Sequence, residues 1–547
     1  MQMLMRAARR SGIAWALAVG LATTASAAAD LGPSLQAFLA KAAETAPAVK
    51  GDTSGPELLA FYQERNFQPI WLDGAKASKK ARDLIEILSS ARADGLEPAD
   101  YATARLKGMV EAASGTDPAQ LESLLSFAAV HYGNDLAAGR VDPSTIDDEI
   151  QQHPEKIPPG KLIRDVAAAA DLKAFFASLP PQTVNYRRLR DALAQYRVIA
   201  EKGGFVPVQA GEPIKPGASD PRVPVLRERL AQSGLQTTPA GDPATYDSAL
   251  EQAVRTFQQR HGLPLDGTIG KKTFEALNVP IERRIEQMVM NLERRRWLPD
   301  DLGERYVFVN MADFELKVVD GAHTIHTTRV VVGTPFHRTP VFSDSIKYVE
   351  LNPFWNVTPS IASKELLPKL KRDPGYLGKN GYRLFSGWGA GAGEVDPHSV
   401  DWSQVSASHF TYKIRQDPGP KNSLGQIKFV FPNTQNIYLH DTPSRQLFQE
   451  TMRAFSHGCI RVQNPVDLAV VLLKDKDGEG WTKEKLTQVI ASGEQKTITL
   501  PKPLPVHLVY LTAWVNKDGS VNFRDDIYGR DNRLAEGLKR ARHMING

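Results

Sequence analysis

The spacing of apolar residues changes along the chain and divides it into regions. Between residues 30 and 205 apolar residues recur at helical spacing, which predicts a mostly helical region. Residues 206–222 are dense in Pro and Gly, the residues that break helices. Helical spacing returns over 223–279. Beyond 303, short apolar runs such as 306–309 predict strands, and Asp320-Gly321 predicts a hairpin turn.

These changes predict a multidomain α+β protein. The segment 355–425 interrupts the strand-rich region and contains many Gly and Pro residues. It is too long for a simple strand connection, so we expect an insertion that lies over the functional site described below. The predicted units are a signal peptide (1–27), a helical scaffold domain (28–205), a linker (206–222), a small three-helix module (223–279), a connecting helix (280–302), a β-sandwich-like domain (303–480) that contains the insertion (355–425), and a C-terminal extension (481–547) that could pack on the scaffold.

The first residues have the pattern of a secretory signal. Arg6, Arg9 and Arg10 form a basic start, residues 13–21 are apolar, and 25–27 make a small-residue cleavage site. The apolar stretch is shorter than the ~20 residues that span a bilayer. We therefore expect an exported, periplasmic protein with no transmembrane segment in the mature chain.

Charge patterning gives no support for a nucleic-acid partner. The chain has a formal net charge of +5, and the three arginines of 1–27 leave the remainder at +2. No basic run is interleaved with aromatic residues. The basic residues at Lys369, Lys371 and Arg372 and the triplet Arg294-Arg295-Arg296 are therefore expected to be solvated faces.

The single cysteine, Cys459, is the strongest candidate for chemistry. It lies in Ser456-His457-Gly458-Cys459-Ile460-Arg461-Val462 and has no cysteine partner for an intramolecular disulfide. A lone thiol in an exported protein is either an inert buried residue or a nucleophile. Gly458 permits close approach of a substrate, and nearby positive charge from His457 and Arg461 would favour the thiolate. The surroundings therefore favour a nucleophile.

His440, at the end of a predicted strand, is the candidate base for this thiol. Thiol and imidazole together can carry acyl transfer through a thioester. The second ring nitrogen needs an acceptor, and either the backbone carbonyl or the carboxylate of Asp441 could supply it. The N–H groups of Gly458 and Cys459 are suitably placed in sequence to bind an oxyanion. A metal site is not expected, since no H-x-x-E-H pattern occurs and His457-x-Cys459 alone is weak.

Two segments resemble known families. The helical segment over 223–279 resembles the three-helix peptidoglycan-binding module of cell-wall enzymes, although a spacer domain that binds nothing would fit as well. The signature His440, fifteen residues, then Ser456-His457-Gly458-Cys459-x-Arg461 resembles the L,D-transpeptidases of the YkuD type, and the long YcbB-like branch is most similar. The residues that carry the first resemblance are Tyr246-Asp247, Ala253-Val254, Phe257-Gln258, Gly262-Leu263, Asp266-Gly267, Gly270 and Thr273. Those that match the L,D-transpeptidases outside the signature are Asn352-Pro353, Trp355-Asn356-Val357, Pro418-Gly419-Pro420, Asn422, Leu424-Gly425 and 510–515.

The resemblance implies that 303–480 is a catalytic domain and 355–425 a capping subdomain. It implies Cys459 as nucleophile, His440 as base, Gly458 and Cys459 as oxyanion donors, and Arg461 as a residue that positions the loop or a substrate carboxylate. His457 could polarise the thiol or be structural.

The implied reaction begins when Cys459 attacks the third residue, diaminopimelate, of a tetrapeptide stem and expels D-alanine. An amine of a neighbouring stem then takes the acyl group, which gives a 3→3 cross-link without a cofactor. The implied partners are peptidoglycan stem peptides, glycan strands and carbapenem inhibitors, and the oligomeric state stays open. Trp355, Tyr382 and Trp388 could line a substrate channel, with core packing favoured for Trp355. An L,D-carboxypeptidase and a non-catalytic wall-binding protein remain alternatives.

Overall fold

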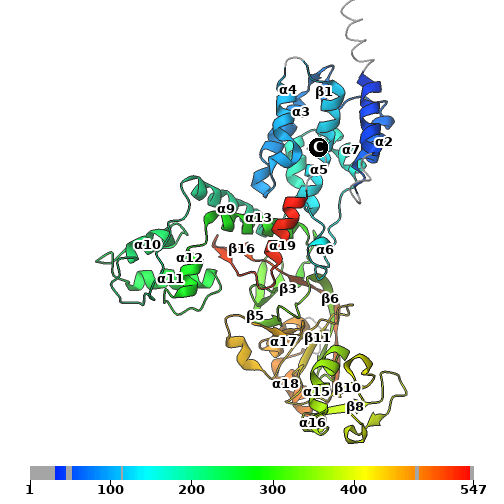
Figure 1. Ribbon diagram of the computed structural model, residues 1–547, viewed down its shortest axis with the longest axis vertical. Helices are drawn as coiled ribbons and strands as arrows, with labels where there is room; N and C mark the ends of the chain where they lie inside the picture. The colour runs from blue at the N-terminus through cyan, green and yellow to red at the C-terminus, as the bar shows by residue number, and fades with distance from the viewer. Residues whose placement is uncertain (1–30, 45–51, 113–114, 475–479, 542–547) are drawn as a thin grey trace, which may run out of the picture.

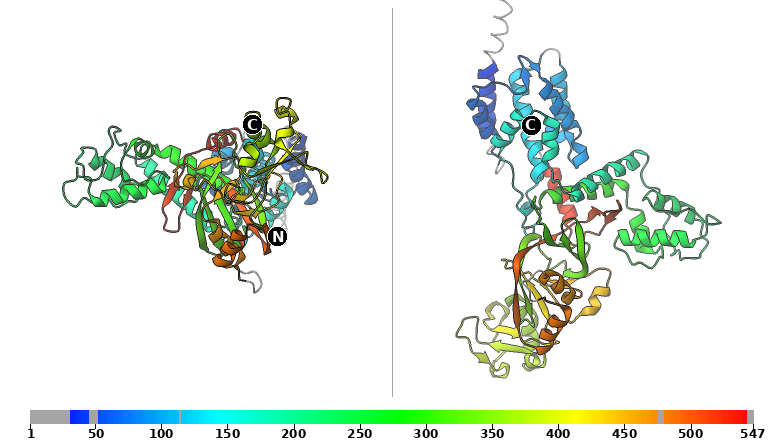
Figure 2. Two further views of the ribbon diagram at one scale, coloured as in Figure 1. Left: turned by 90° about the horizontal axis from the view of Figure 1, so that it is seen from below. Right: turned by 180° about the vertical axis from the view of Figure 1, so that it is seen from behind.

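The computed structural model describes residues 31–44, 52–112, 115–474 and 480–541 as three lobes that meet at a central junction (Figure 1). A helical lobe lies at one end of the long axis, a β-rich lobe lies at the other, and a small helical module projects sideways (Figure 2). The predicted signal peptide lies outside the described residues. Of the helices that are described, none is long and apolar enough to cross a membrane.

The helical lobe is the predicted scaffold, and its core is built around the long helix α5. Glu122 of α5 is fully buried and is satisfied by the hydroxyl of Tyr62 and the N–H of Ile70, each at 2.6 Å. The elements are a helix over 31–44, α2 (Ser54–Glu64), β1 (Leu72–Asp73), β2 (Lys76–Ala77), α3 (Lys79–Ser89), the 3₁₀ helices Ala91–Asp94 and Pro98–Tyr101, α4 (Thr103–Glu111), α5 (Pro118–Ala138), α6 (Pro143–Ile146), α7 (Pro159–Ala168) and α8 (Leu172–Ser178).

The projecting module has the three predicted helices, α10 (Val223–Ala231), α11 (Ser248–Arg260) and α12 (Lys271–Leu277). The segment 206–222, which we expected to be a linker, contributes to the core of this module. Val208 and Ile214 are buried in it, and Ile214 forms a β-bridge with Ile269. The Pro and Gly residues of 206–222 therefore belong to an extended segment that packs against the module, and this segment is not a free linker.

Helices α9 (Val184–Glu201) and α13 (Ile281–Arg296) pack together at the junction of the lobes. The prediction that Arg294-Arg295-Arg296 forms a solvated face is wrong, because these residues are only 5%, 7% and 2% exposed. Arg294 pairs with Asp531 and Arg296 pairs with Glu293. Asp531 comes from a distant part of the chain, which local charge patterning cannot reveal.

The β-rich lobe is one nine-stranded mixed sheet that closes on itself, because β4 pairs with both β3 and β5. The last strand, β15, lies between β6 and β3. The predicted C-terminal extension thus completes the sheet. The strands are β3 (Arg305–Asn310), β4 (Glu315–Asp320), β5 (His323–Gly333), β6 (Phe342–Leu351), β11 (Ile427–Val430), β12 (Leu439–His440), β13 (Ala454–Ser456), β14 (Ile460–Val462) and β15 (Lys496–Val509).

Two helices, α17 (Pro465–Leu473) and α18 (Lys483–Ser492), pack their apolar faces on this sheet. The C-terminal residues add a hairpin of β16 (Ala513–Val515) and β17 (Val521–Phe523) and the helix α19 (Arg530–Arg540). Helix α19 contacts α13 and α6, so the end of the described chain returns to the junction with the scaffold.

The predicted insertion is a small subdomain with its own core at the far end of the β-rich lobe (Figure 1). Its four-stranded sheet has the order β7–β10–β8–β9, and β7 and β10 bring its two ends together. The elements are β7 (Trp355–Asn356), α14 (Pro359–Ile361), a π-helical turn (Ala362–Leu366), α15 (Leu367–Leu370), α16 (Tyr376–Lys379), β8 (Tyr382–Phe385), β9 (Glu394–Val395), the 3₁₀ turns Pro397–Ser399 and Ala407–His409, and β10 (Lys413–Gln416).

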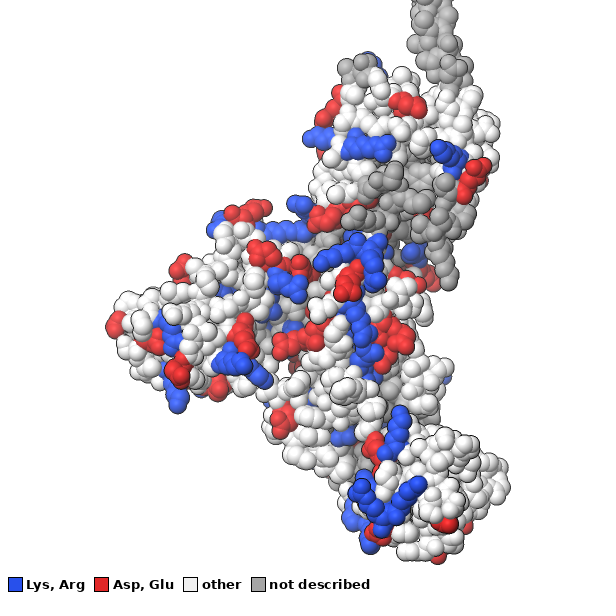
Figure 3. Space-filling view, viewed as in Figure 1, with Lys and Arg blue, Asp and Glu red and all other residues white. Residues whose placement is uncertain are grey.

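A buried charge cluster joins the scaffold to the β-rich lobe. The carboxylate of Asp147 lies 3.3 Å from Arg338, 3.2 Å from Arg530 and 3.1 Å from Arg533. Ile150, which also belongs to the scaffold, forms an isolated parallel β-bridge with Val341. On the surface, Figure 3 shows charges of both signs mixed over the scaffold and the module, in keeping with the small net charge.

Candidate active site

Strand register places Cys459 and His440 on the same face of the sheet. Strands β12 and β14 are parallel neighbours, with Leu439 opposite Ile460 and His440 opposite Arg461. Because side chains alternate between the two faces of a sheet, Cys459 lies on the same face as Arg461 and His440. Leu439 and Ile460 point the other way and are fully buried in the core. The sulfur and the imidazole are therefore diagonal neighbours on adjacent strands.

The turn that carries Cys459 is fixed by a compact set of hydrogen bonds. The hydroxyl of Ser456 donates to the carbonyl of Cys459 at 2.5 Å and accepts from the N–H of Gly458 at 3.1 Å. The hydroxyl of Thr339 donates to the carbonyl of Gly458 at 2.7 Å. Gly458 has a φ of 110°, a region that disfavours any side chain. Its backbone N–H already donates to the hydroxyl of Ser456. In the predicted oxyanion role, this N–H would have to donate to the oxyanion as well.

His440 is buried, and the backbone carbonyl of Asp441 holds its ring. Nδ1 lies 2.5 Å from this carbonyl oxygen, which places the ring proton on Nδ1 and leaves Nε2 as the acceptor. Of the two acceptors that the sequence left open, the carbonyl therefore contacts the imidazole. The Asp441 carboxylate accepts instead from the N–H of Gln426 at 3.0 Å. Burial, and next the charge of Arg461, lower the pKa of His440 to about 3.

The thiol of Cys459 is half-buried and directed toward the carbonyl of Asn436, at 3.6 Å from Sγ. Burial raises its pKa, although the backbone N–H of Tyr438 and the charges of Lys428 and Arg461 act in the opposite direction. With the thiol pKa raised and the imidazole pKa lowered, the resting pair is neutral at pH 7. The thiolate that the sequence led us to expect is therefore not the resting state, and the proton moves as the sulfur attacks.

Two basic residues flank the pair. Arg461 lies on the same face, and its buried Nε has no hydrogen-bond partner among the described residues. Lys428 of β11 lies opposite His440 in the strand register and 3.4 Å from Glu350. Sequence reasoning missed Lys428, because only the pairing of two strands brings it to the site. Both cations favour negative charge on the sulfur or on a bound substrate.

The insertion reaches this turn through His457. Its Nε2 lies 2.6 Å from Oε1 of Glu365 in the π-helical turn of the insertion, and its ring packs on His337 with centroids 4.7 Å apart. His457 therefore contacts the cap, and no hydrogen bond in the described chain joins it to the thiol.

The three aromatic residues predicted to line a channel belong to the insertion and are not equivalent. Trp355 and Tyr382 contact each other in the subdomain core, with ring centroids 6.1 Å apart. Trp388 is 51% exposed and lies under the ammonium of Lys413 at 5.6 Å. Packing thus accounts for Trp355 and Tyr382, while Trp388 remains available at the surface.

This geometry agrees with comparisons to protein families. The model of the L,D-transpeptidase catalytic domain, YkuD, matches residues 304–483. The chain contains a YkuD-type L,D-transpeptidase catalytic domain. A "Scaffold domain" model matches residues 56–193, and a model described as "Putative peptidoglycan binding domain" matches residues 219–277. The L,D-transpeptidase resemblance, the peptidoglycan-binding module and the α+β class predicted from the sequence are confirmed.

The chain is also similar to individual proteins. A Haemophilus influenzae protein named "Putative L,D-transpeptidase" is 37% identical over 249 residues, which are 46% of this chain and 49% of that protein. The chain thus aligns with about half the length of that relative. Solved L,D-transpeptidases from Xylanimonas cellulosilytica and Stackebrandtia nassauensis are each 15% identical. They cover 55% and 56% of this chain and 99% and 97% of their own, with TM-scores of 0.18 and 0.21.

Proposed function

We propose that this chain is an exported L,D-transpeptidase that forms 3→3 cross-links in peptidoglycan through a thioester on Cys459. The observation that carries the proposal is the neutral thiol beside a neutral imidazole whose Nδ1 is held by the carbonyl of Asp441. This arrangement suits a nucleophile and base that exchange one proton during acyl transfer. The peptidoglycan-binding module supports a cell-wall substrate.

In the first step the Sγ–H proton passes to Nε2 of His440 as Sγ attacks the carbonyl carbon of the third stem residue. The tetrahedral intermediate collapses when the C–N bond breaks, and the proton on His440 passes to the leaving amine of D-alanine. In the second step the amine of a neighbouring stem attacks the thioester and loses a proton to His440, and the thiolate that is released takes this proton back from His440. Neither step requires a metal or an organic cofactor.

Arg461 is our candidate for binding a substrate carboxylate. Its guanidinium shares the face of the sheet with the nucleophile and has an unsatisfied buried Nε among the described residues. A carboxylate of the stem could satisfy this donor, and charge-assisted hydrogen bonds of this kind fix orientation as well as affinity. The N–H of Cys459, with that of Gly458 if Ser456 releases it, would stabilise the oxyanion.

The insertion favours transfer of the acyl group to an amine and disfavours hydrolysis. It is joined to the catalytic turn through His457 and Glu365 and covers the end of the β-rich lobe. Covering a thioester slows its loss to water.

The deciding experiment is mass spectrometry of the products that the purified protein forms from defined tetrapeptide muropeptides. We expect cross-linked dimers and free D-alanine. Tripeptide and D-alanine without dimers would instead establish the L,D-carboxypeptidase, and no conversion would establish a binding role.

A further inference from the structure

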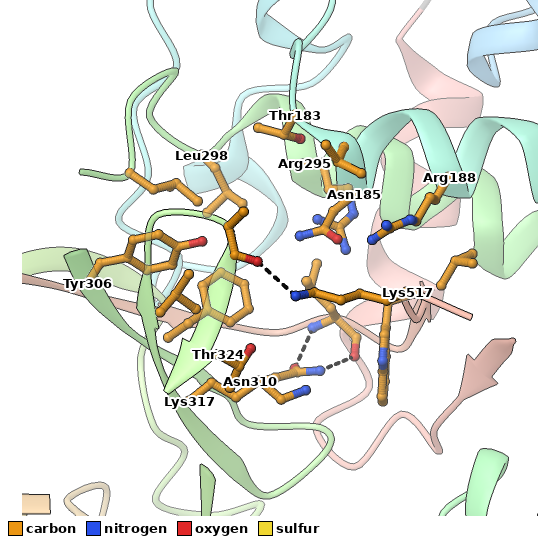
Figure 4. Close-up of a pocket in the computed structure, with 18 of the residues that line it drawn as sticks. Thr183, Asn185, Arg188, Arg295, Leu298, Tyr306, Asn310, Lys317, Thr324 and Lys517 are labelled. Carbon is orange, nitrogen blue, oxygen red and sulfur yellow. Dashed lines mark hydrogen bonds between the residues drawn. The ribbon is translucent and has the colours of Figure 1, made fainter. Parts of the chain in front are cut away.

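A cavity of about 580 Å³ lies at the junction of the lobes (Figure 4). Its wall is formed by the start of α9, the end of α13, strands β3 and β4, and the β16–β17 hairpin. The cavity adjoins the His323 end of β5, whereas the Gly333 end of that strand pairs with Ser456 beside Cys459. It is therefore separate from the catalytic pair. Its volume is within the range of pockets that bind small organic molecules.

An unpaired guanidinium is the most informative feature of this cavity. Arg295 lines it, is only 7% exposed, and has no hydrogen-bond partner at Nε among the described residues. No carboxylate of the described chain forms an ion pair with it, whereas its neighbours Arg294 and Arg296 have Asp531 and Glu293. Burial lowers the pKa of Arg295 to about 10. A buried charge without a counter-ion is costly, and a bound anion would relieve that cost.

The start of α9 lies beside Arg295 and independently favours an anion. Thr183, Val184 and Asn185 line the cavity, and the first turn of this 18-residue helix contains no acidic side chain. Figure 4 shows Asn185 next to Arg295 in the same wall. Free N–H groups and the positive end of the helix dipole attract negative charge at this position.

The other charged groups of the wall limit the ligand to a small negative charge, because they include the exposed carboxylate of Asp300 and groups that are already paired. Lys317 pairs with Glu315 at 2.8 Å, Asp313 pairs with Arg524 at 2.6 Å, and the ammonium of Lys517 donates to a backbone carbonyl. Arg188, which also lines the cavity, has no ion pair in the described chain. Apolar and aromatic side chains form the remaining wall; they include Leu298, Tyr306, Phe308, Leu511 and Trp514.

From these contacts we propose that the cavity is a binding site for an organic carboxylate with an apolar body, such as the carboxyl end of a short peptide. The carboxylate binds the guanidinium of Arg295 and the N–H groups at the start of α9, with Arg188 at its outer side. The planar guanidinium matches a carboxylate through two parallel hydrogen bonds. The apolar body contacts the aromatic wall. This site is independent of the reaction proposed for Cys459.

The test is calorimetric titration of the full-length Cys459→Ala protein with N-acetyl-leucine, its neutral amide and inorganic phosphate. Because the thiol is absent, the result does not depend on whether the proposed reaction is correct. We expect saturable binding of N-acetyl-leucine and binding of the amide that is weaker by about tenfold or more. Arg295→Met should weaken binding of the carboxylate by a similar factor, and its melting temperature would verify folding.

Two adjacent arginines on α9, Arg187 and Arg188, allow a matched comparison of two variants, neither of which changes a buried residue. Arg188→Ala should weaken binding, whereas Arg187→Ala should not, because Arg187 is exposed and bonds the carbonyl of Gln182. The proposal is overturned if the carboxylate binds the Arg295→Met and Arg188→Ala proteins as well as the parent, or if the amide binds equally well. Phosphate binding tighter than N-acetyl-leucine would also overturn it, as the mark of an inorganic-anion site.

Discussion

His457 and Glu365 join the catalytic turn to the insertion, with Nε2 and Oε1 2.6 Å apart. The two side chains are 40% and 42% exposed, and an exposed contact of this kind contributes little, roughly 0.2–1 kcal/mol even when both groups are charged. The contact therefore orients the cap over the turn without locking it. A contact this weak would let the cap move away from the turn when a large substrate binds.

Glu365→Gln should make the insertion more mobile by a small factor. Loss of the charge should raise the rate of limited proteolysis within 358–372 by up to about fivefold. The matched control is Glu394→Gln, which weakens an exposed ion pair of the same subdomain, with Arg383. Equal proteolysis of the 358–372 segment in both variants would show that the His457 contact does not hold the cap.

Cys459→Ala and His440→Ala should both fold normally and yet form no covalent carbapenem adduct within the turnover time. The first variant lacks the nucleophile, and the second lacks the base, a loss worth about 10²–10⁴-fold in rate. Intact-mass measurement after incubation with the carbapenem checks each variant, and circular dichroism verifies the fold. A full adduct on the His440 variant would mean that another group deprotonates the sulfur.

Asp441→Asn should keep most of the activity, because the backbone carbonyl and not the carboxylate holds His440. The carboxylate accepts from Gln426 and lies 3.6 Å from Arg445, so its loss should lower stability by about 1–2 kcal/mol. Acylation rate and melting temperature, measured together, separate the two roles. A drop of more than about 100-fold in acylation with an unchanged melting temperature would assign the base-orienting role to the carboxylate.

The pH dependence of thiol alkylation should follow the thiol alone. Burial raises the pKa of Cys459, so the thiolate fraction, and with it the iodoacetamide rate, should still be rising at pH 8.5, the ordinary cysteine value. His440, with a pKa of about 3, is neutral throughout pH 5–9 and adds no inflection there. Glutathione under the same conditions is the reference thiol. A plateau that begins near pH 6–7 would indicate a preformed thiolate–imidazolium pair.

The sequence predicts what depends on local order and misses what depends on distant segments. Cys459 and His440 can be found because strand alternation and a short motif bring them to one face. The burial of Arg296 cannot be found, because Asp94, Tyr186 and Glu293 surround it only after folding. The same holds for Glu365, which contacts His457 from within the insertion, and for β15, which enters the sheet between two strands that come far earlier in the chain.

Replacing the insertion by a short loop should reduce acceptor use more than acylation. Residues Asn356 and Arg415 are paired across β7 and β10, so a Gly-Ser loop can replace 358–412 without stretching the sheet. The insertion has its own core, whereas Cys459 and His440 belong to the main sheet. Carbapenem acylation should therefore persist in the shortened protein, while the exposed thioester loses its acyl group to water and the ratio of dimer to tripeptide falls. Equal loss of acylation and of dimer formation would show that the insertion supports the first step as much as the second.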